Sequence, residues 1–596
     1  MRYSYYPGVF FILGLTLSLM VVPSLMPTTK SQLVIAQPSA GDQRPNFLLI
    51  MGDDFGFSDL GTFGSEISTP NLDKLAKDGK ILTNYYTHPV CSPARGTFLT
   101  GIDNHIVGIG TMFEGITPNQ VNKTGYETYI TDRVVTIAEL LRDAGYNTLL
   151  SGKWHLSGKG YHNGTGPADR GFDKSFTLLE SGANHFTYEP YYPGNVATFM
   201  DNGKIVEKPN GTKYSNEFYT DKMIDYIKDS QNGDRPFFAY LAYQVAHTPF
   251  QSPPENMNKY RGVYDAGWDN IREKRIEKQK ELGIWPANMT LPKTSPALPD
   301  WNALPIEEQK QRAKILEAHA GMIDNMDYNI GRLIQFLKDT GDYDNTFIMF
   351  TSDNGGSSPS DTNAALDGVG SVGQSFKKDT SYDAIGGKDS YWGYGWQGAV
   401  MSNAPFSGSK TTMYNGGIRP PFVLKEPHSA NTPEIDIVKG LVHVSDMVPT
   451  FLEYANTTHP SEYNGKPVAA LMGKSIKPML EGVVEQVHPD DEGIASEMFG
   501  NRAVLMGDWK TRYNIFPVDD GHWKLFNIKE DITESTDLSK EHPDILSKMV
   551  TVYDEYAKDI GIIPPEPSAE QMALMQMKRG NEIANVTSSP ALPTQD

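Results

Sequence analysis

The sequence predicts an α/β fold: a large, mostly parallel sheet flanked by helices, with a smaller C-terminal α+β domain. Continuous apolar runs of strand length, typical of strands buried on both faces, alternate with segments of helical periodicity. Polar residues directly follow several of these runs, as they do at the ligand-binding carboxyl edge of a parallel sheet. Hydrophobic residues make up 39% of the 596, enough for a sizeable core.

The first forty residues are typical of an export signal. Arg2 supplies positive charge, and Val9 to Val22 is mostly apolar. At about 14 residues this run is shorter than the about 20 that a membrane-spanning helix needs. Val34-Ile35-Ala36 is a candidate cleavage site before Gln37. We therefore expect a signal peptide over 1–36, contact with the export machinery, and a periplasmic or secreted protein without stable membrane insertion after cleavage. An uncleaved anchor is the alternative.

Charge and cysteine usage narrow the class of protein. Lys and Arg number 53 against 73 Asp and Glu, a formal net charge of −20. Such a surface repels nucleic acid, so we expect no nucleic-acid partner. A site for an anionic substrate must therefore carry its own cations. The single cysteine, Cys91, cannot form an intramolecular disulfide.

The large domain is expected over residues 44–480. Gly79, Gly145, Gly283 and Gly341 are read as helix ends. The expected strands are 47–51, 147–150, 237–241, 346–350 and 421–425, and the expected helices begin near 71, 132, 271, 307 and 446.

A long insertion and a smaller domain complete the chain. Residues 357–407, rich in Gly, Ser, Asp and Tyr, are expected to fold over the mouth of a site at the sheet edge or to be partly mobile. The insertion's aromatic residues either wall a pocket or pack the insertion itself; they are Tyr382, Tyr391, Trp392 and Tyr394. The C-terminal α+β domain is expected over 481–562, with strands near 509–516 and 522–527 and a helix at 543–556, and an extended or disordered tail over 563–596.

Cys91 begins a motif. A single cysteine is ordinarily interpreted as a small buried hydrophobe, but the residues that follow this one favour a functional role. The run Cys91-Ser92-Pro93-Ala94-Arg95 is followed by Leu99-Thr100-Gly101. This pattern resembles the signature of the type I, formylglycine-dependent sulfatases of the alkaline phosphatase superfamily. The resemblance covers roughly residues 46–538, looks closest to bacterial arylsulfatases, and implies an alkaline-phosphatase-like sheet with a sulfatase catalytic domain over 44–480.

The resemblance also implies a modified Cys91. In the family, a maturation enzyme that generates formylglycine oxidises this cysteine to Cα-formylglycine (3-oxoalanine), whose hydrate is the nucleophile. The expected activity is hydrolysis of a small-molecule sulfate ester, aryl or alkyl, to an alcohol or phenol and inorganic sulfate through a formylglycine-sulfate intermediate.

Acidic pairs after two of the predicted strands form a candidate metal site. Asp53-Asp54 and Asp353-Asn354 offer hard oxygen ligands, suited to Ca²⁺ or Mg²⁺ rather than zinc. Two ordinary acidic turns are the alternative. The resemblance implies one Ca²⁺ per chain, with Mg²⁺ less favoured, and the modified Cys91 as a further ligand.

Four further residues match the family's catalytic positions. Lys153 and His155 lie two positions apart on an extended segment, so their side chains point the same way. His247 follows the strand at 237–241. Lys410 precedes Gly-Gly-x-Arg-x-Pro by five variable residues, the last of which is Asn415, where many members carry Glu.

The resemblance implies a role for each side chain. The ammonium groups of Lys153 and Lys410 would stabilise charge on the sulfuryl oxygens. Arg95 would orient the hydrate and Asp353 accept its proton. His247 would protonate the leaving group, and His155 would deprotonate the intermediate.

Two other functions stay open. A phosphonate monoester or phosphodiester hydrolase of the same superfamily can share the Cys-x-Pro-x-Arg motif. A chain whose Cys91 stays a thiol would bind a sulfated ligand without turning it over.

Overall fold

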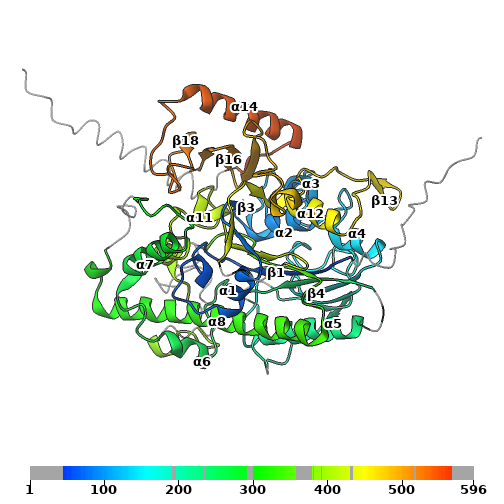
Figure 1. Cartoon of the computed structure of the whole chain (residues 1–596), viewed down its shortest axis with the longest axis horizontal. Helices are drawn as coiled ribbons and strands as arrows, with labels where there is room; N and C mark the ends of the chain where they lie inside the picture. The colour runs from blue at the N-terminus through cyan, green and yellow to red at the C-terminus, as the bar shows by residue number, and fades with distance from the viewer. Residues whose placement is uncertain are drawn as a thin grey trace, which may run out of the picture. The chain divides into compact units, whose positions relative to one another are not determined.

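The computed structural model describes residues 44–190, 196–357 and 379–566, with gaps at 212, 232, 234, 291–299, 380, 391, 430–431, 433 and 516–517 (Figure 1). The expected signal peptide lies outside the described residues, as do 358–378 of the insertion and all but the first four residues of the expected tail. Within the described ranges, no helix has both the length and the apolar character needed to cross a bilayer.

Ten of the described strands form one sheet, in the order β11-β2-β10-β9-β1-β8-β4-β5-β6-β7. The five neighbours from β9 to β5 are parallel, which confirms the predicted mostly parallel sheet. The strands that flank them, β10 and β6, run antiparallel. The bounds are β1 Asn46–Gly52, β2 Lys80–Leu82, β4 Asn147–Lys153, β5 Lys174–Leu178, β6 Phe199–Asp201, β7 Lys204–Val206, β8 Phe237–Ala242, β9 Thr346–Ser352, β10 Phe422–Lys425 and β11 Asp436–Val438.

Helices cover both faces of this sheet, as Figure 1 shows. Alternate residues of β1 belong to different cores: Leu48 and Ile50 to one, Phe47, Leu49 and Met51 to the other. The first core contains side chains of α1 (Pro70–Lys77), α5 (Ser215–Ser230), α7 (Gly267–Glu281), α8 (Ile306–Thr340) and α10 (Gly395–Ser402). The second contains side chains of α2 (Cys91–Thr100), α3 (Asn104–Val107), α4 (Ile137–Asp143), α12 (Met447–Tyr454) and α13 (Lys477–Leu480).

The C-terminal sheet is antiparallel, in the order β15-β16-β17-β18. One face packs under α14 through Val504, Leu525 and Tyr553. The opposite face packs against Met413 and Ile418 of the large domain. The bounds are β15 Ile494–Met498, β16 Asn501–Met506, β17 Trp509–Tyr513, β18 Lys524–Asn527 and α14 Pro543–Ile560. The smaller α+β unit is therefore present, whereas its boundaries at 481 and 562 stay predictions.

Some predicted helix ends are wrong. Helix α1 ends at Lys77, and Gly79 is not left-handed. A Cβ atom at Gly79 would lie 2.0 Å from the Leu424 carbonyl oxygen, so the glycine permits close contact with β10. Helix α4 starts at Ile137 rather than near Asp132, because Thr136 and Glu139 form a capping box.

Candidate active site

The sheet brings the predicted residues to one edge. Asp53-Asp54 follow β1, Asp353-Asn354 follow the neighbouring β9, Lys153 ends β4, and His247 lies five residues after β8. Because these four strands are parallel neighbours, their carboxyl ends meet. Cys91 is the first residue of α2 and contacts Asp53 and Asp54, so the amino end of this helix lies at the same edge.

Cys91 contacts both an acidic and a basic group. Its Sγ lies 3.3 Å from Asp53 Oδ1 and 3.8 Å from Asp54 Oδ1, and Lys410 Nζ lies 3.2 Å from Sγ. Burial, together with the charges of Asp353 and Asp53, raises the pKa of the Cys91 thiol well above its usual range. A protonated buried thiol is a weak nucleophile, so this environment does not activate the sulfur itself.

Three cations pair with three carboxylates in the cluster. Lys153 Nζ lies 2.5 Å from Asp53 Oδ2, and Lys410 Nζ lies 2.8 Å from Asp54 Oδ1. The Arg95 Nη2 atom lies 2.7 Å from Asp353 Oδ2. All six side chains are buried, so each charge depends on its partner. Their formal charges cancel.

The three carboxyl groups are not equivalent. Burial disfavours ionisation of Asp53 and Asp54, but the nearby ammonium groups, Lys153 for Asp53 and Lys410 for Asp54, outweigh it and hold both pKa values below the usual range. Asp353 differs, because burial and the charge of Asp53 outweigh Arg95 and raise its pKa. Asp353 is therefore the carboxylate that most readily accepts a proton.

The donor set fits a divalent cation. One ligand atom from each of Asp53, Asp54, Cys91 and Asp353 lies within 4.8 Å of the others. Asn354 Oδ1 is buried and accepts no hydrogen bond from the described part of the chain, while its Nδ2 donates to Asp54 Oδ1 at 2.7 Å. A buried oxygen without a partner, beside carboxylate oxygens, is satisfied by a hard cation such as Ca²⁺ or Mg²⁺.

The two histidines occupy different positions. His247 Nδ1 donates to the Thr248 carbonyl oxygen at 2.6 Å, and Nε2 lies 3.8 Å from Asp54 Oδ2. His155 contacts a different carboxylate, with Nε2 3.9 Å from Glu114 Oε1. Burial lowers the pKa of His155 to about 4, so its ring is neutral near pH 7. Its main-chain carbonyl accepts a hydrogen bond from Ser92 Oγ at 2.7 Å, which ties it to the residue after Cys91.

Three contacts of the site were missed from the sequence. Glu114 faces His155, Thr87 Oγ1 donates to the Asp353 carbonyl oxygen at 2.9 Å, and the Tyr240 hydroxyl lies 3.5 Å from Arg95 Nη1. Tyr240 lies within the apolar run of β8, where a tyrosine is indistinguishable from a core residue. Glu114 and Thr87 lie in segments without a motif.

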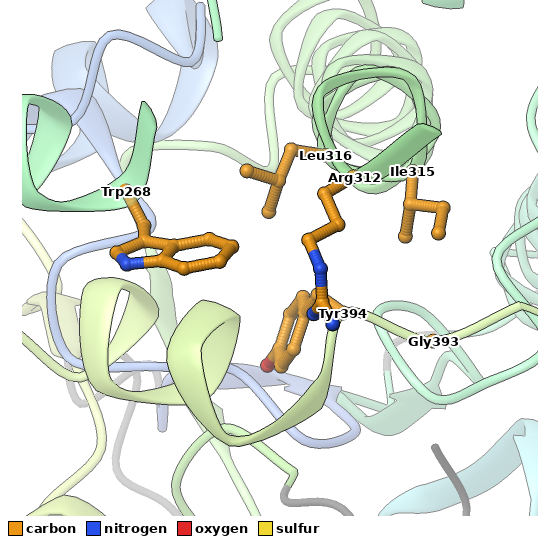
Figure 2. Close-up of a pocket in the computed structure, with 6 residues that line it drawn as sticks. All are labelled: Trp268, Arg312, Ile315, Leu316, Gly393 and Tyr394. Carbon is orange, nitrogen blue, oxygen red and sulfur yellow. The ribbon is translucent and has the colours of Figure 1, made fainter. Parts of the chain in front are cut away.

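The described aromatic residues of the insertion mostly pack. Trp392 and Tyr394 are buried, and the Tyr394 ring lies 4.8 Å from both Phe250 and His319, centroid to centroid. Tyr382 is 49% exposed and stacks under Lys314, and Tyr391 lies outside the described residues. Figure 2 shows Tyr394 beside Arg312 and Trp268, around a cavity of about 10 Å³ that has room for one water molecule at most. This cavity is a packing gap rather than a substrate pocket.

Comparison with known proteins shows similarity in sequence and fold to sulfatases. The sulfatase family profile matches residues 45–457. A sulfatase of Schizosaccharomyces pombe is 37% identical over 558 residues, which cover 91% of this chain and 99% of that protein. The arylsulfatase of Klebsiella aerogenes is 38% identical over 445 residues, covering 74% and 92%. The crystal structure of Ps i-CgsB is similar with a TM-score of 0.61 at 25% identity, covering 91% of this chain and 99% of that chain.

Proposed function

Because the chain belongs to the sulfatase family and is therefore a sulfuric ester hydrolase, we propose that it cleaves sulfate monoesters of phenols or alcohols by means of a formylglycine made from Cys91. One observation carries this proposal. Cys91 Sγ lies at the start of α2, 3.3 Å from a carboxylate oxygen of Asp53 and 3.2 Å from the ammonium nitrogen of Lys410. A nucleophile formed at this atom would have a cation beside it.

The oxygens of Asp53, Asp54, Asp353 and Asn354 would hold a divalent cation, for which we propose Ca²⁺ in preference to Mg²⁺. Ca²⁺ accepts about six to eight oxygen ligands in variable geometry, of which this site would supply four, whereas Mg²⁺ usually retains several waters and is bound through one or two carboxylates. Together, the aldehyde hydrate and the cation would supply an oxygen nucleophile that ionises near neutral pH and carries the sulfuryl group until sulfate leaves.

The protein's own residues would bind the sulfuryl group and move protons. Lys410 and Lys153 would neutralise charge on the sulfuryl oxygens. His247 would give a proton to the leaving oxygen as its bond to sulfur breaks, which releases the alcohol or phenol. His155, neutral near pH 7, would accept the proton whose loss expels sulfate. Arg95 would fix Asp353, the carboxylate with the raised pKa, as an acceptor for the hydrate's proton.

Mass spectrometry and a substitution at Cys91 test the nucleophile together. Conversion of the thiol to an aldehyde exchanges sulfur for oxygen and removes two hydrogens, so the peptide should be about 18 Da lighter. Cys91→Ala should lower the kcat for p-nitrophenyl sulfate by at least about 100-fold. Full activity in a folded Cys91→Ala protein, or a fully active protein that retains the thiol, would refute the formylglycine mechanism.

The alternatives give different results in the same preparation. Preference for a phosphodiester or phosphonate monoester by orders of magnitude in kcat/KM would identify the related hydrolase. Binding of a sulfate ester without turnover, in a protein whose Cys91 is unmodified, would identify a ligand-binding protein.

A further inference from the structure

The C-terminal sheet holds the loop that carries Lys410. The loop spans residues 407–414 and leads into α11 (Asn415–Ile418). Main-chain groups of Thr411, Met413 and Asn415 bond to side chains of the C-terminal sheet and of the segments that follow its strands. The pairs are Asn501 Nδ2 with the Thr411 carbonyl oxygen at 2.9 Å, Asn514 Oδ1 with the Met413 amide at 3.0 Å, and Glu534 Oε2 with the Asn415 amide at 2.6 Å.

One of these three side chains comes from the C-terminal sheet and two come from segments that follow its strands. Asn501 begins β16, Asn514 directly follows β17, and Glu534 lies in the segment after β18. Each is at most 4% exposed. Buried polar side chains at this depth are costly unless their hydrogen bonds are made, so their pairing with the loop is part of the folded structure.

Glu534 is itself fixed from the sheet side. Its Oε1 lies 3.0 Å from Lys510 Nζ and 3.2 Å from Arg512 Nε. Lys510 also donates to Asn415 Oδ1 at 2.8 Å. Asn415 is therefore held twice: Glu534 accepts from its main-chain N–H, and Lys510 donates to its side-chain oxygen.

The other side of the loop is bonded to the active-site segments. The Lys410 amide donates to the Gly356 carbonyl oxygen at 3.0 Å, two residues beyond Asn354. The Thr411 amide donates to the Pro89 carbonyl oxygen at 2.7 Å, two residues before Cys91. Thr411 also has a φ of +72°, a left-handed conformation that a β-branched residue adopts only when its surroundings impose it.

We propose that Asn501, Asn514 and Glu534 are positioning residues for Lys410: they fix the backbone on which its ammonium group reaches Cys91 and Asp54. The C-terminal sheet is then a component of the sulfuryl-binding site, although none of these three side chains belongs to the charged cluster itself. This inference rests on the proposed function, because it requires Lys410 to act on the sulfuryl group.

A double-mutant cycle tests the proposal. Glu534→Gln and Asn514→Leu are each made in the wild-type background and in Lys410→Ala, with exposed Glu530→Gln as the matched control. Formylglycine occupancy is measured by mass spectrometry, and activity is compared only below the melting transition. The kcat/KM for p-nitrophenyl sulfate and the Kd of inorganic sulfate are the readouts.

A displaced Lys410 should reduce kcat/KM by about 10- to 100-fold in Glu534→Gln and Asn514→Leu, and weaken sulfate binding. In the Lys410→Ala background the same substitutions should change both quantities less than twofold, because their effect acts through the missing ammonium group. Glu530→Gln should match the wild type throughout. Asn514→Leu keeps the test decisive if Glu534→Gln does not fold.

Two results would overturn the inference: full kcat/KM in folded Glu534→Gln or Asn514→Leu, or equal losses with and without Lys410. Failure of the proposed function looks different, because Lys410→Ala alone would then leave sulfatase activity unchanged.

Discussion

At the residue scale, Lys153 and Lys410 are not interchangeable. Lys153 contacts Asp53, whereas Lys410 contacts both Asp54 and the Cys91 sulfur. These ammonium groups neutralise the same carboxylates that would hold a divalent cation. We infer that a cation at these carboxylates would share this neutralisation and leave the lysines more available to an anionic substrate.

Metal removal is the corresponding prediction. A ligand that binds only the folded state raises its stability, by about 2.7 kcal/mol at 100 times the Kd. We expect a chelator to lower the Tm and weaken binding of inorganic sulfate, and Ca²⁺ to restore both better than Mg²⁺. Calorimetry across a metal titration measures both effects.

Asp353→Asn is the variant for this experiment, because it removes one ligand charge while keeping the side chain's shape. It should need a higher Ca²⁺ concentration for the same Tm. A Tm that does not respond to chelation or to added Ca²⁺ would contradict a divalent site at these residues.

The acidic residues of the cluster were predictable from the sequence because each directly follows an apolar strand. Asp53 and Asp353 are 300 residues apart in the chain, yet parallel strands that are neighbours in the sheet must end at the same edge. Nothing comparable marks Glu114. Its approach to His155 depends on one short 3₁₀ turn, Phe113–Gly115, which is too short to show a hydrophobic periodicity.

At the element scale, helix α2 shows why a functional helix escaped prediction. All ten of its residues are buried, so Cys91–Thr100 has no polar face and no amphipathic pattern. Only Gly101, left-handed with φ +70°, marks its end. The motif therefore predicts the chemistry of this segment, whereas its helical structure depends on tertiary packing.

Helix α3 supplies a pH-dependent contact with the C-terminal sheet. His105 Nδ1 lies 3.0 Å from Asp103 and Nε2 lies 3.1 Å from Glu497 of β15. Burial opposes its charge, but the two carboxylates outweigh it and raise its pKa from 6.5 to about 9. Because the folded-state pKa is the higher one, this stabilisation is complete below about pH 6.5 and is lost as pH rises to about 9.

We predict that His105→Gln removes this pH dependence. The shift corresponds to about 3 kcal/mol at most, so the stability difference between wild type and variant should be largest at pH 6 and shrink between pH 7 and pH 9. Urea unfolding at fixed pH values measures it. His522→Gln is the control, because the His522 side chain is 80% exposed. A constant difference across this range would show that His105 is neutral.

At the scale of the whole molecule, the sequence predicts a smaller C-terminal unit but not its contacts with the site. Asn415 and Glu534 are 119 residues apart, and their hydrogen bond requires the C-terminal sheet to pack its Met498 and Phe526 face on Met413. Strand patterns indicate that a face is apolar without indicating what covers it. Contacts of this kind follow only from the assembled fold.

Net charge gives the last prediction. The formal charge is −20, while the three cations and three carboxylates of the site cancel and a bound Ca²⁺ would add two positive charges, so an approaching sulfate ester is repelled by the surface at long range and attracted only close to the site. Raising the ionic strength from about 10 mM to about 150 mM shortens the Debye length from about 30 Å to about 8 Å, which screens the distant charges and leaves the contacts of the site almost intact. The KM for p-nitrophenyl sulfate should therefore fall about two- to threefold in NaCl, with kcat unchanged, whereas sucrose of equal osmolality should have no effect. A KM that rises with NaCl would mean that the field of the site, and not that of the whole surface, governs the approach of substrate.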